Sequence, residues 1–240
     1  MADVKELLAR EGIPVAEERL DLIRRYQEML IDWNSRMDLT SVPPEEMAAR
    51  HFLDSLLPLR EGKLIPASAS LIDVGTGAGF PGLALAAARP DLRVTLLEAQ
   101  GKRCQFLNAV KEELGLDHVR VIQERAEVLG RHPDHREQYD LAVARAVAGL
   151  NVLCEYLLPF VRVRGQALCW KGPAVLEEMA DGQAAAEKLG GAVLTPVEMC
   201  SEALEGKHLL VPIQKMEKTV SQYPRKNGIP SKRPLKAEKK

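Results

Sequence analysis

Three alternating glycines mark the part of this chain where chemistry is first expected. Residues 71–82 read as an apolar strand, a turn that contains Gly75, Gly77 and Gly79, and the start of a helix. Glycine has no Cβ, so the backbone can turn sharply there and approach a ligand closely. The pattern predicts that a nucleotide-like molecule lies against the turn. A tight turn without a ligand is the structural alternative.

Two cofactor motifs overlap in this turn. Residues 77–82 fit the dinucleotide pattern G-x-G-x-x-G, which alone is weak evidence. Residues 73–79 fit D-x-G-x-G-x-G, which resembles the first motif of class I S-adenosylmethionine-dependent methyltransferases. A phosphate loop is excluded because no Gly-Lys-Ser/Thr follows.

An acidic residue stands where such a fold holds a ribose. Residues 93–98 form a second apolar stretch that ends at Glu98, about 20 residues past the glycines, where doubly wound folds bind ribose hydroxyls. Glu98 is therefore the predicted ribose ligand, with a solvated strand end as the alternative. NAD and S-adenosylmethionine both contain this ribose, so Glu98 does not separate the two cofactors.

Further polar residues follow the next strands. Ala126 and Glu127 come just after a third strand, where backbone groups can recognise an adenine edge. Arg145 ends a fourth strand between two alanines, which favours a partly buried guanidinium in the cleft over a surface salt bridge. His51 and Asp54 share a helix face, either as a structural pair or as a wall of the cofactor pocket.

The elements that position these residues alternate along the chain. Apolar spacing predicts N-terminal helices over 4–9, 15–33 and from Ser41 to Leu56, the last one ended by Pro58 and Gly62. The remaining elements are strands over 71–74, 93–98, 118–122, 139–145, 166–172, 192–199 and 208–213, and helices after Pro81 and over 102–114, 150–160 and 173–189. Alternating strands and helices predict an α/β Rossmann-like fold, with a mostly parallel sheet, an antiparallel final strand and an N-terminal helical extension. The expected parts are an N-terminal helical extension over residues 1–60, a Rossmann-like core over 61–214 and a basic C-terminal arm over 215–240.

Composition excludes several other classes. The 240 residues are 46% hydrophobic and 28% charged, as in an ordinary globular protein. No apolar run approaches the ~18 residues of a membrane span, and the first residues resemble no signal peptide, so the cytoplasm is the expected location. A monomer is the default expectation, since the sequence has no signal for the oligomeric state. The four cysteines form no C-x-x-C pair, and His132 and His135 lack partners at ligand spacing, so no metal is expected.

The net charge of −1 hides an asymmetry between the C-terminal segment and the rest. Residues 215–240 contain nine Lys or Arg against two Glu, a formal charge of +7, and the remainder carries −8. A basic end suggests a polyanionic partner, with a solvated terminus as the alternative. Arg225, Lys226, Lys232 and Arg233 lie among prolines and are the predicted phosphate contacts.

Six motifs stand together in this chain: DVGTGAGFPG at 73–82, HFLDSL at 51–56, RAE at 125–127, ARAVA at 144–148, Lys171-Gly172 and YPRKNGIP at 223–230. In this combination the chain closely resembles the RsmG (GidB) family. The resemblance implies a bacterial enzyme that methylates guanine N7 in 16S rRNA of the small ribosomal subunit, with S-adenosylmethionine as cofactor. It also implies cofactor contacts at Gly75, Phe80, Glu98, Ala99, Gln100, Ala126, Glu127 and Arg145. Asp38 replaces the usual Asn of the family's Asn-Leu-Thr.

The implied chemistry needs no general base. Guanine N7 exposes a free lone pair, so attack on a sulfonium methyl requires no deprotonation. No Asp/Asn-Pro-Pro-Tyr/Phe follows the fourth strand, and no Pro-Cys or Thr-Cys supplies a nucleophile. Alignment alone can supply on the order of 7–11 kcal/mol, so Arg145 is expected to position cofactor or substrate without moving a proton. An NAD-dependent oxidoreductase and a non-catalytic RNA-binding factor are the alternatives.

Overall fold

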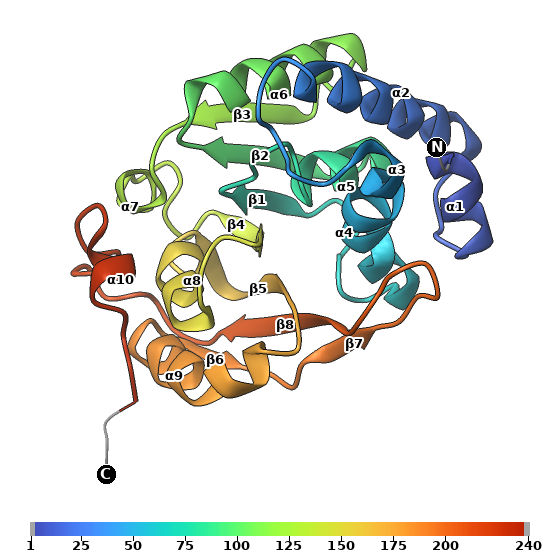
Figure 1. Cartoon of the computed structure of the whole chain (residues 1–240). Helices are drawn as coiled ribbons and strands as arrows, with labels where there is room; N and C mark the ends of the chain where they lie inside the picture. The colour runs from blue at the N-terminus through green and yellow to red at the C-terminus, as the bar shows by residue number, and fades with distance from the viewer. Residues whose placement is uncertain (1–2, 238–240) are drawn as a thin grey trace.

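One eight-stranded sheet organises the molecule (Figure 1). The computed structural model describes residues 3–237. The strands are β1 (Ser70–Val74), β2 (Arg93–Glu98), β3 (Val119–Gln123), β4 (Tyr139–Arg145), β5 (Val161–Lys171), β6 (Gly191–Val193), β7 (Val197–Met199) and β8 (His208–Lys215). The order is β3-β2-β1-β4-β5-β8-β6, with β7 also paired to β8. The first five strands are parallel and β8 is antiparallel to β5, so the predicted α/β fold and its antiparallel final strand are confirmed.

Two strand predictions need correction. Residues 192–199, expected as one strand, form β6 and β7, because Pro196 lies between them and cannot donate to the ladder. β5 begins at Val161, five residues before the predicted start, and its pairing with β4 shifts register between Tyr139 and Leu141. Neither change moves a predicted site residue.

Helices cover both faces of the sheet (Figure 1). They are α1 (Val4–Arg10), α2 (Glu17–Asn34), α5 (Gly82–Ala88), α6 (Gly101–Glu113), α7 (Ala126–Leu129), α8 (Leu150–Leu157), α9 (Val175–Lys188) and α10 (Ile229–Lys232). Successive strand residues point to opposite faces, so Leu71 joins the apolar cluster of the N-terminal helices, α5 and α6, whereas Ile72 joins that of α8 and α9. Among the helices of residues 3–237, none is long and apolar enough to cross a membrane.

The third predicted helix is a composite run that continues past Pro58. It consists of α3 (Pro44–Met47), a π-helical turn η1 (Ala48–Leu53), α4 (Asp54–Leu56) and a 3₁₀ segment η2 (Leu57–Glu61), and it ends at Gly62 with φ +59°. Pro58 falls in the first turn of η2, where a missing N–H costs little, so it does not end the run as expected. In the π turn the Asp54 N–H donates to the carbonyl of Ala49. Such turns often occur at functional sites.

The N-terminal helices share their core with the sheet. Tyr26 of α2 is fully buried, and its hydroxyl donates to the carbonyl of Ala78 in the glycine turn. The Arg19 guanidinium donates to the carbonyl of Ala87 at the end of α5 over 2.6 Å. The division at residue 60 stays a prediction, and these contacts join the first part tightly to the second.

Candidate functional site

The glycine turn after β1 is closed by a buried carboxylate. Asp73 Oδ2 accepts hydrogen bonds from Thr76 Oγ1 at 2.6 Å and from the Gly82 N–H at 2.7 Å. Burial raises the pKa of Asp73 to about 6, and these two hydrogen bonds oppose that rise. Asp73 Oδ1 is buried without a partner among the described residues. The glycine turn therefore has beside it one buried hydrogen-bond acceptor, Asp73 Oδ1, that lacks a donor among the described residues.

The three glycines serve different purposes. A Cβ on Gly77, at φ +60°, would meet only the Arg103 guanidinium at 3.9 Å, so space is open there. A Cβ on Gly79 would lie 2.2 Å from the Tyr26 hydroxyl, so this glycine permits close packing of α2 on the turn. A Cβ on Gly75 would lie 3.1 Å from the Val147 side chain. Gly77 has the clearest open approach for a ligand.

Glu98 lies beside that opening at the end of β2. Its side chain is nearly buried, and its two oxygens accept from the N–H groups of Gly77 at 3.0 Å and Gln100 at 2.8 Å. Arg103 lies 3.9 Å from the same carboxylate, and its Nε is buried without a partner among the described residues. Open space, a fixed carboxylate and two unsatisfied polar atoms fit an adenosyl ligand. Ala99 links Glu98 to Gln100, the N-cap of α6.

Glu127 has a partner that the sequence did not predict. Its carboxylate is buried and accepts from the Gly228 N–H at 2.8 Å, which ties α7 to the C-terminal segment. Ala126 begins α7 directly after β3, as expected. The predicted adenine contact through the backbone of these two residues stays a prediction.

Arg145 lies in a polar network that joins the sheet to the N-terminal helices. Its guanidinium donates to Asp54 Oδ2 at 2.8 Å, to His51 Nδ1 at 2.9 Å and to the carbonyl of Arg50 at 2.9 Å. It also lies over the Phe80 ring, 5.1 Å from the ring centroid. The predicted pairing of His51 with Asp54 is therefore mediated by Arg145.

Phe80 connects the glycine turn with this network. Its ring stacks on Tyr26 and on His51, with centroid distances of 5.4 Å and 4.7 Å. The Thr40 hydroxyl lies 2.8 Å from His51 Nε2, so both ring nitrogens of His51 have partners. Burial, followed by the charge of Arg145, lowers the pKa of His51 to about 3. His51 is therefore neutral at pH 7.

Asp38, where the sequence departs from the family pattern, is exposed.

His208 completes the network and was not predicted. Its Nδ1 lies 2.8 Å from Asp54 Oδ1, and the Trp170 indole donates to the carbonyl of Asp54 at 2.9 Å. Burial favours a higher pKa for Asp54, but hydrogen bonds from His208 and Arg145 lower it overall. The hydrogen bond to Asp54 raises the pKa of His208. No motif surrounds His208 in the sequence, so only the fold could identify it.

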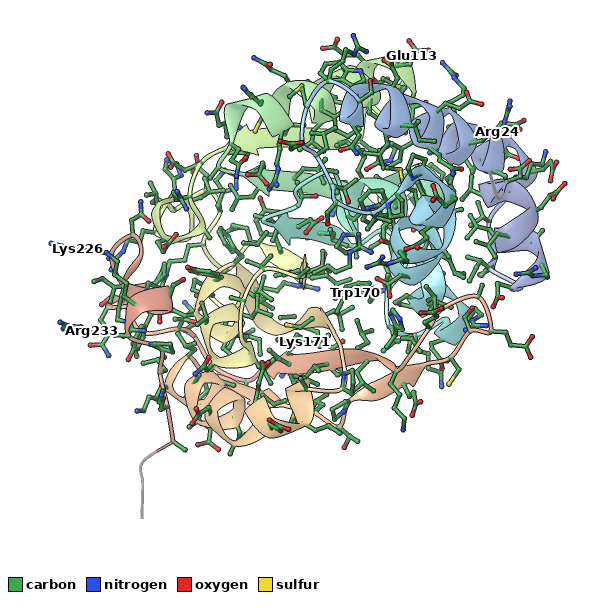
Figure 2. All side chains as sticks on the ribbon, in the orientation of Figure 1. Arg24, Glu113, Trp170, Lys171, Lys226 and Arg233 are labelled. Atoms are coloured by element: carbon green, nitrogen blue, oxygen red, sulfur yellow. The ribbon has the colours of Figure 1, made fainter. Side chains whose placement is uncertain are left out.

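A cavity of about 950 Å³ opens over this network, at the carboxyl ends of β4 and β5. Its walls come from the composite helical run and from the segment between β7 and β8, and its lining includes Arg50, Asp54, Arg145, Trp170, Lys171 and His208. In Figure 2 Trp170 and Lys171 lie in the middle of the molecule, whereas Lys226 and Arg233 project from its edge. The glycine turn does not line this cavity, which adjoins the predicted cofactor site.

The basic C-terminal segment is anchored to the domain. Arg225 donates through Nε and Nη2 to Glu155, which is almost fully buried, with the closest approach at 2.6 Å. This pairing revises the prediction for Arg225, because its guanidinium is already bound and holds the segment in place. Lys226, Lys232 and Arg233 are exposed, and no described carboxylate pairs with them. Lys215, the first residue of the predicted arm, is buried within β8.

Fold and site together define a class of protein. A sheet of this order, with a glycine turn after β1, an acid at the end of β2 and an antiparallel strand beside β5, is that of a class I S-adenosylmethionine-dependent methyltransferase. The chain belongs to the rRNA small subunit methyltransferase G (GidB) family, whose model matches residues 19–209. This assignment confirms the predicted cofactor, S-adenosylmethionine, and excludes the NAD-dependent oxidoreductase alternative.

Individual relatives agree with this assignment. The Ribosomal RNA small subunit methyltransferase G of Alkaliphilus metalliredigens is 44% identical over 226 residues, which cover 94% of each chain. MtNAS, solved in complex with MTA and tNA, gives a TM-score of 0.56 at 17% identity over 83% of this chain and 74% of its own. A predicted O-methyltransferase, Atu636 of Agrobacterium tumefaciens, gives 0.51 at 20% identity over 69% and 80%. The two structural likenesses show the fold alone.

Proposed function

We propose that this rRNA methyltransferase transfers the methyl group of S-adenosylmethionine to N7 of a guanine in 16S rRNA, by in-line displacement without a general base. The observation that carries the proposal is the state of the buried titratable groups below the cavity. Both nitrogens of His51 have partners, and its lowered pKa of about 3 makes it a poor proton acceptor. Both oxygens of Asp54 are bonded as well. Guanine N7 requires no proton removal before it attacks a methyl group.

The cofactor half of the site is proposed at the glycine turn. Bound S-adenosylmethionine supplies an electrophilic methyl group on a sulfonium. Gly77 leaves room for close backbone contact, and the carboxylate of Glu98 can accept from ribose hydroxyls. The other proposed contacts are Gly75, Gly79, Phe80, Ala99, Gln100, Ala126, Glu127 and Arg145. Gly79 and Glu127 contribute by shaping the site, because Tyr26 and Gly228 occupy their near surroundings.

The acceptor base is proposed to enter the cavity above Arg145 and Trp170. Enzymes that modify a base act on single-stranded nucleic acid or draw the base out of its stack, and a cavity of about 950 Å³ at the strand ends provides the space for a base. Alignment of the base with the methyl donor then supplies most of the rate. The exposed residues Lys226, Lys232 and Arg233 are proposed to bind phosphates of the same RNA.

Product identification tests the proposal. Purified protein is incubated with tritiated S-adenosylmethionine and small-subunit rRNA or subunits from cells that lack the gene, and the nucleosides are separated. The expected product is N7-methylguanosine, located by primer extension after chemical cleavage. A Glu98→Ala variant, with lower cofactor affinity measured by calorimetry, serves as the control. Label on an exocyclic amine or a pyrimidine carbon would overturn the N7 assignment, and RNA binding without label would favour the non-catalytic factor.

A further inference from the structure

We propose that Asp54 is a positioning residue of methyl transfer, which keeps the charge of Arg145 neutralised beside the acceptor base. The inference rests on the proposed N7 chemistry and extends it to the wall of the cavity. Arg145 Nη1 lies 2.8 Å from Asp54 Oδ2, and both side chains are almost buried, with 13% and 10% of their surfaces exposed. Charges in such surroundings interact strongly because little water screens them.

Geometry fixes this carboxylate from three directions. Asp54 starts α4 directly after the π turn, and its carbonyl accepts from the Trp170 indole at 2.9 Å. Its second oxygen lies 2.8 Å from His208 Nδ1. Arg145 in turn is held by the carbonyl of Arg50 and by His51. Neither member of the ion pair can therefore turn away without losing several hydrogen bonds.

The Arg and Lys side chains that line the cavity besides Arg145 are paired as well, and His208 shares Asp54 with Arg145. Arg50 lies 2.6 Å from Glu46, and Lys171 lies 2.9 Å from Glu178. Lys207 lies 3.8 Å from Glu198. The pairs of Arg50 and Lys207 are exposed and contribute little energy because water and salt screen them, whereas the Lys171–Glu178 pair is partly buried. The Arg145–Asp54 pair is the most buried of the four, so it affects the potential inside the cavity most strongly.

The reaction explains why this neutralisation matters. The N7 lone pair forms a bond to the methyl carbon as the S–C bond breaks, and the electrons of the broken bond stay on sulfur as a neutral thioether. The positive charge moves to the purine, and no proton is transferred. An unpaired Arg145 would repel this charge as it develops, whereas a neutral pair does not. Asp54 thereby lowers the barrier through Arg145, without touching the base.

Charge removal at constant shape tests the inference. Asp54→Asn is expected to lower kcat for N7-methylguanosine about 100-fold, the size seen when preorganised electrostatic groups are removed, with KM for the cofactor changed less than about threefold. Asp54→Glu keeps the charge and should restore at least about a tenth of the wild-type kcat. The matched control is Glu198→Gln, which removes the exposed partner of Lys207 and should change kcat less than about twofold.

A binding measurement separates charge from mere structure. Asp54→Asn should weaken binding of an rRNA fragment that carries N7-methylguanine, a cation, about 10-fold more than binding of the unmethylated fragment. Equal weakening of both fragments, or an unchanged kcat, would overturn the inference. Production of N7-methylguanosine by the wild type is measured first, so failure of the proposed function is recognised separately.

A double variant keeps the test decisive if Asp54→Asn does not fold. In Arg145→Gln the charge that Asp54 neutralises is gone, so adding Asp54→Asn should change kcat by less than about threefold. A further loss of more than about threefold in the double variant would show that Asp54 acts independently of Arg145, and would overturn the inference.

Discussion

The proposed cofactor half and the proposed acceptor half of the site are built in different ways. Most of the proposed cofactor half lies within a short stretch of chain, from Asp73 to Gln100, and the hydrogen bonds of this stretch join residues that are near in sequence. The acceptor half joins Asp54, Arg145 and His208, and the residues of its Asp54–His208 contact are 154 positions apart. A local motif can thus be recognised from the sequence, whereas an assembled site exists only once the chain has folded.

The largest effect on stability is expected at Gly79, where the glycine turn contacts helix α2. Gly79→Ala places a Cβ 2.2 Å from the Tyr26 hydroxyl at a φ of +99°, and should reduce the free energy of unfolding by about 3 kcal/mol or more. The matched Gly77→Ala variant meets no close atom, and should cost about 1 kcal/mol through its backbone conformation while weakening cofactor binding. Urea unfolding and calorimetry with S-adenosylhomocysteine measure both. Equal stability of the two variants would contradict this division of roles.

A smaller effect, on the salt dependence of RNA binding, is expected from the exposed cations of the basic C-terminal segment. Replacing Lys226, Lys232 and Arg233 together by Ala should lower the slope of log affinity against log salt by about 2, since each phosphate contact with single-stranded RNA contributes about 0.7. Cofactor affinity should not change. Titrations of an rRNA fragment at several salt concentrations measure the slope.

The control for this triple variant removes charge elsewhere. The control variant combines Lys5→Ala and Arg24→Ala. These residues belong to α1 and α2, which lie far from α10 (Figure 1). A loss of slope in the control that is as large per charge removed would show that RNA binding depends on net charge and not on the C-terminal segment. Arg225→Ala is unsuitable as a member of the set, because it would leave Glu155 buried and unpaired.

His51 lies between the two proposed halves of the site, and its titration measures how much its burial contributes to the free energy of unfolding. Its pKa is lowered from 6.5 to about 3, so the unfolded chain binds a proton between these pH values that the folded protein does not. The contribution of His51 to stability is therefore complete above pH 6.5 and falls by about 1.4 kcal/mol per pH unit as pH decreases below it. Unfolding of wild type and His51→Gln from pH 7 to 4 tests this. Asp73 titrates in both proteins, so the difference isolates His51, and a difference that is independent of pH would contradict the burial argument.

The smallest effect is expected on the outer face of α2. Arg24 and Glu28 form an exposed pair at 3.2 Å, one helical turn apart, and Arg24 points away from the sheet (Figure 2). Arg24→Ala should change the free energy of unfolding by only about 0.3 kcal/mol and leave methyl transfer unaltered. A marked loss of activity would mean that the N-terminal helices contribute to the site by more than their inner face.

The sequence predicted the parallel core well because its signals are local. Strands β2 and β4 begin and end where the apolar pattern predicted, and Glu98 lies beside Gly77 as the motif spacing required. Errors arose where a distant contact or a single residue overrides the pattern. Pro58 continues a helical run in a 3₁₀ segment, and Pro196 divides one expected strand into two.

The acceptor side could be predicted only in part. Arg145 and the pair His51 and Asp54 were singled out from their flanking residues and spacing, but their mutual contact depends on how the π turn packs against β4. No sequence pattern around His208 indicates its role. The polar residues around Arg225 likewise gave no indication that its partner is the buried Glu155. A charged residue's partner is a property of the fold, so composition alone assigned Arg225 to RNA.

Phe80 belongs by sequence to the glycine turn, yet its ring stacks on Tyr26 and His51 from the N-terminal helices. Ring stacking therefore sets the distance between the glycine turn and the network of His51, Asp54 and Arg145. The thickness of an aromatic ring is constant, so a change in the length of a surface loop would leave this distance unaltered.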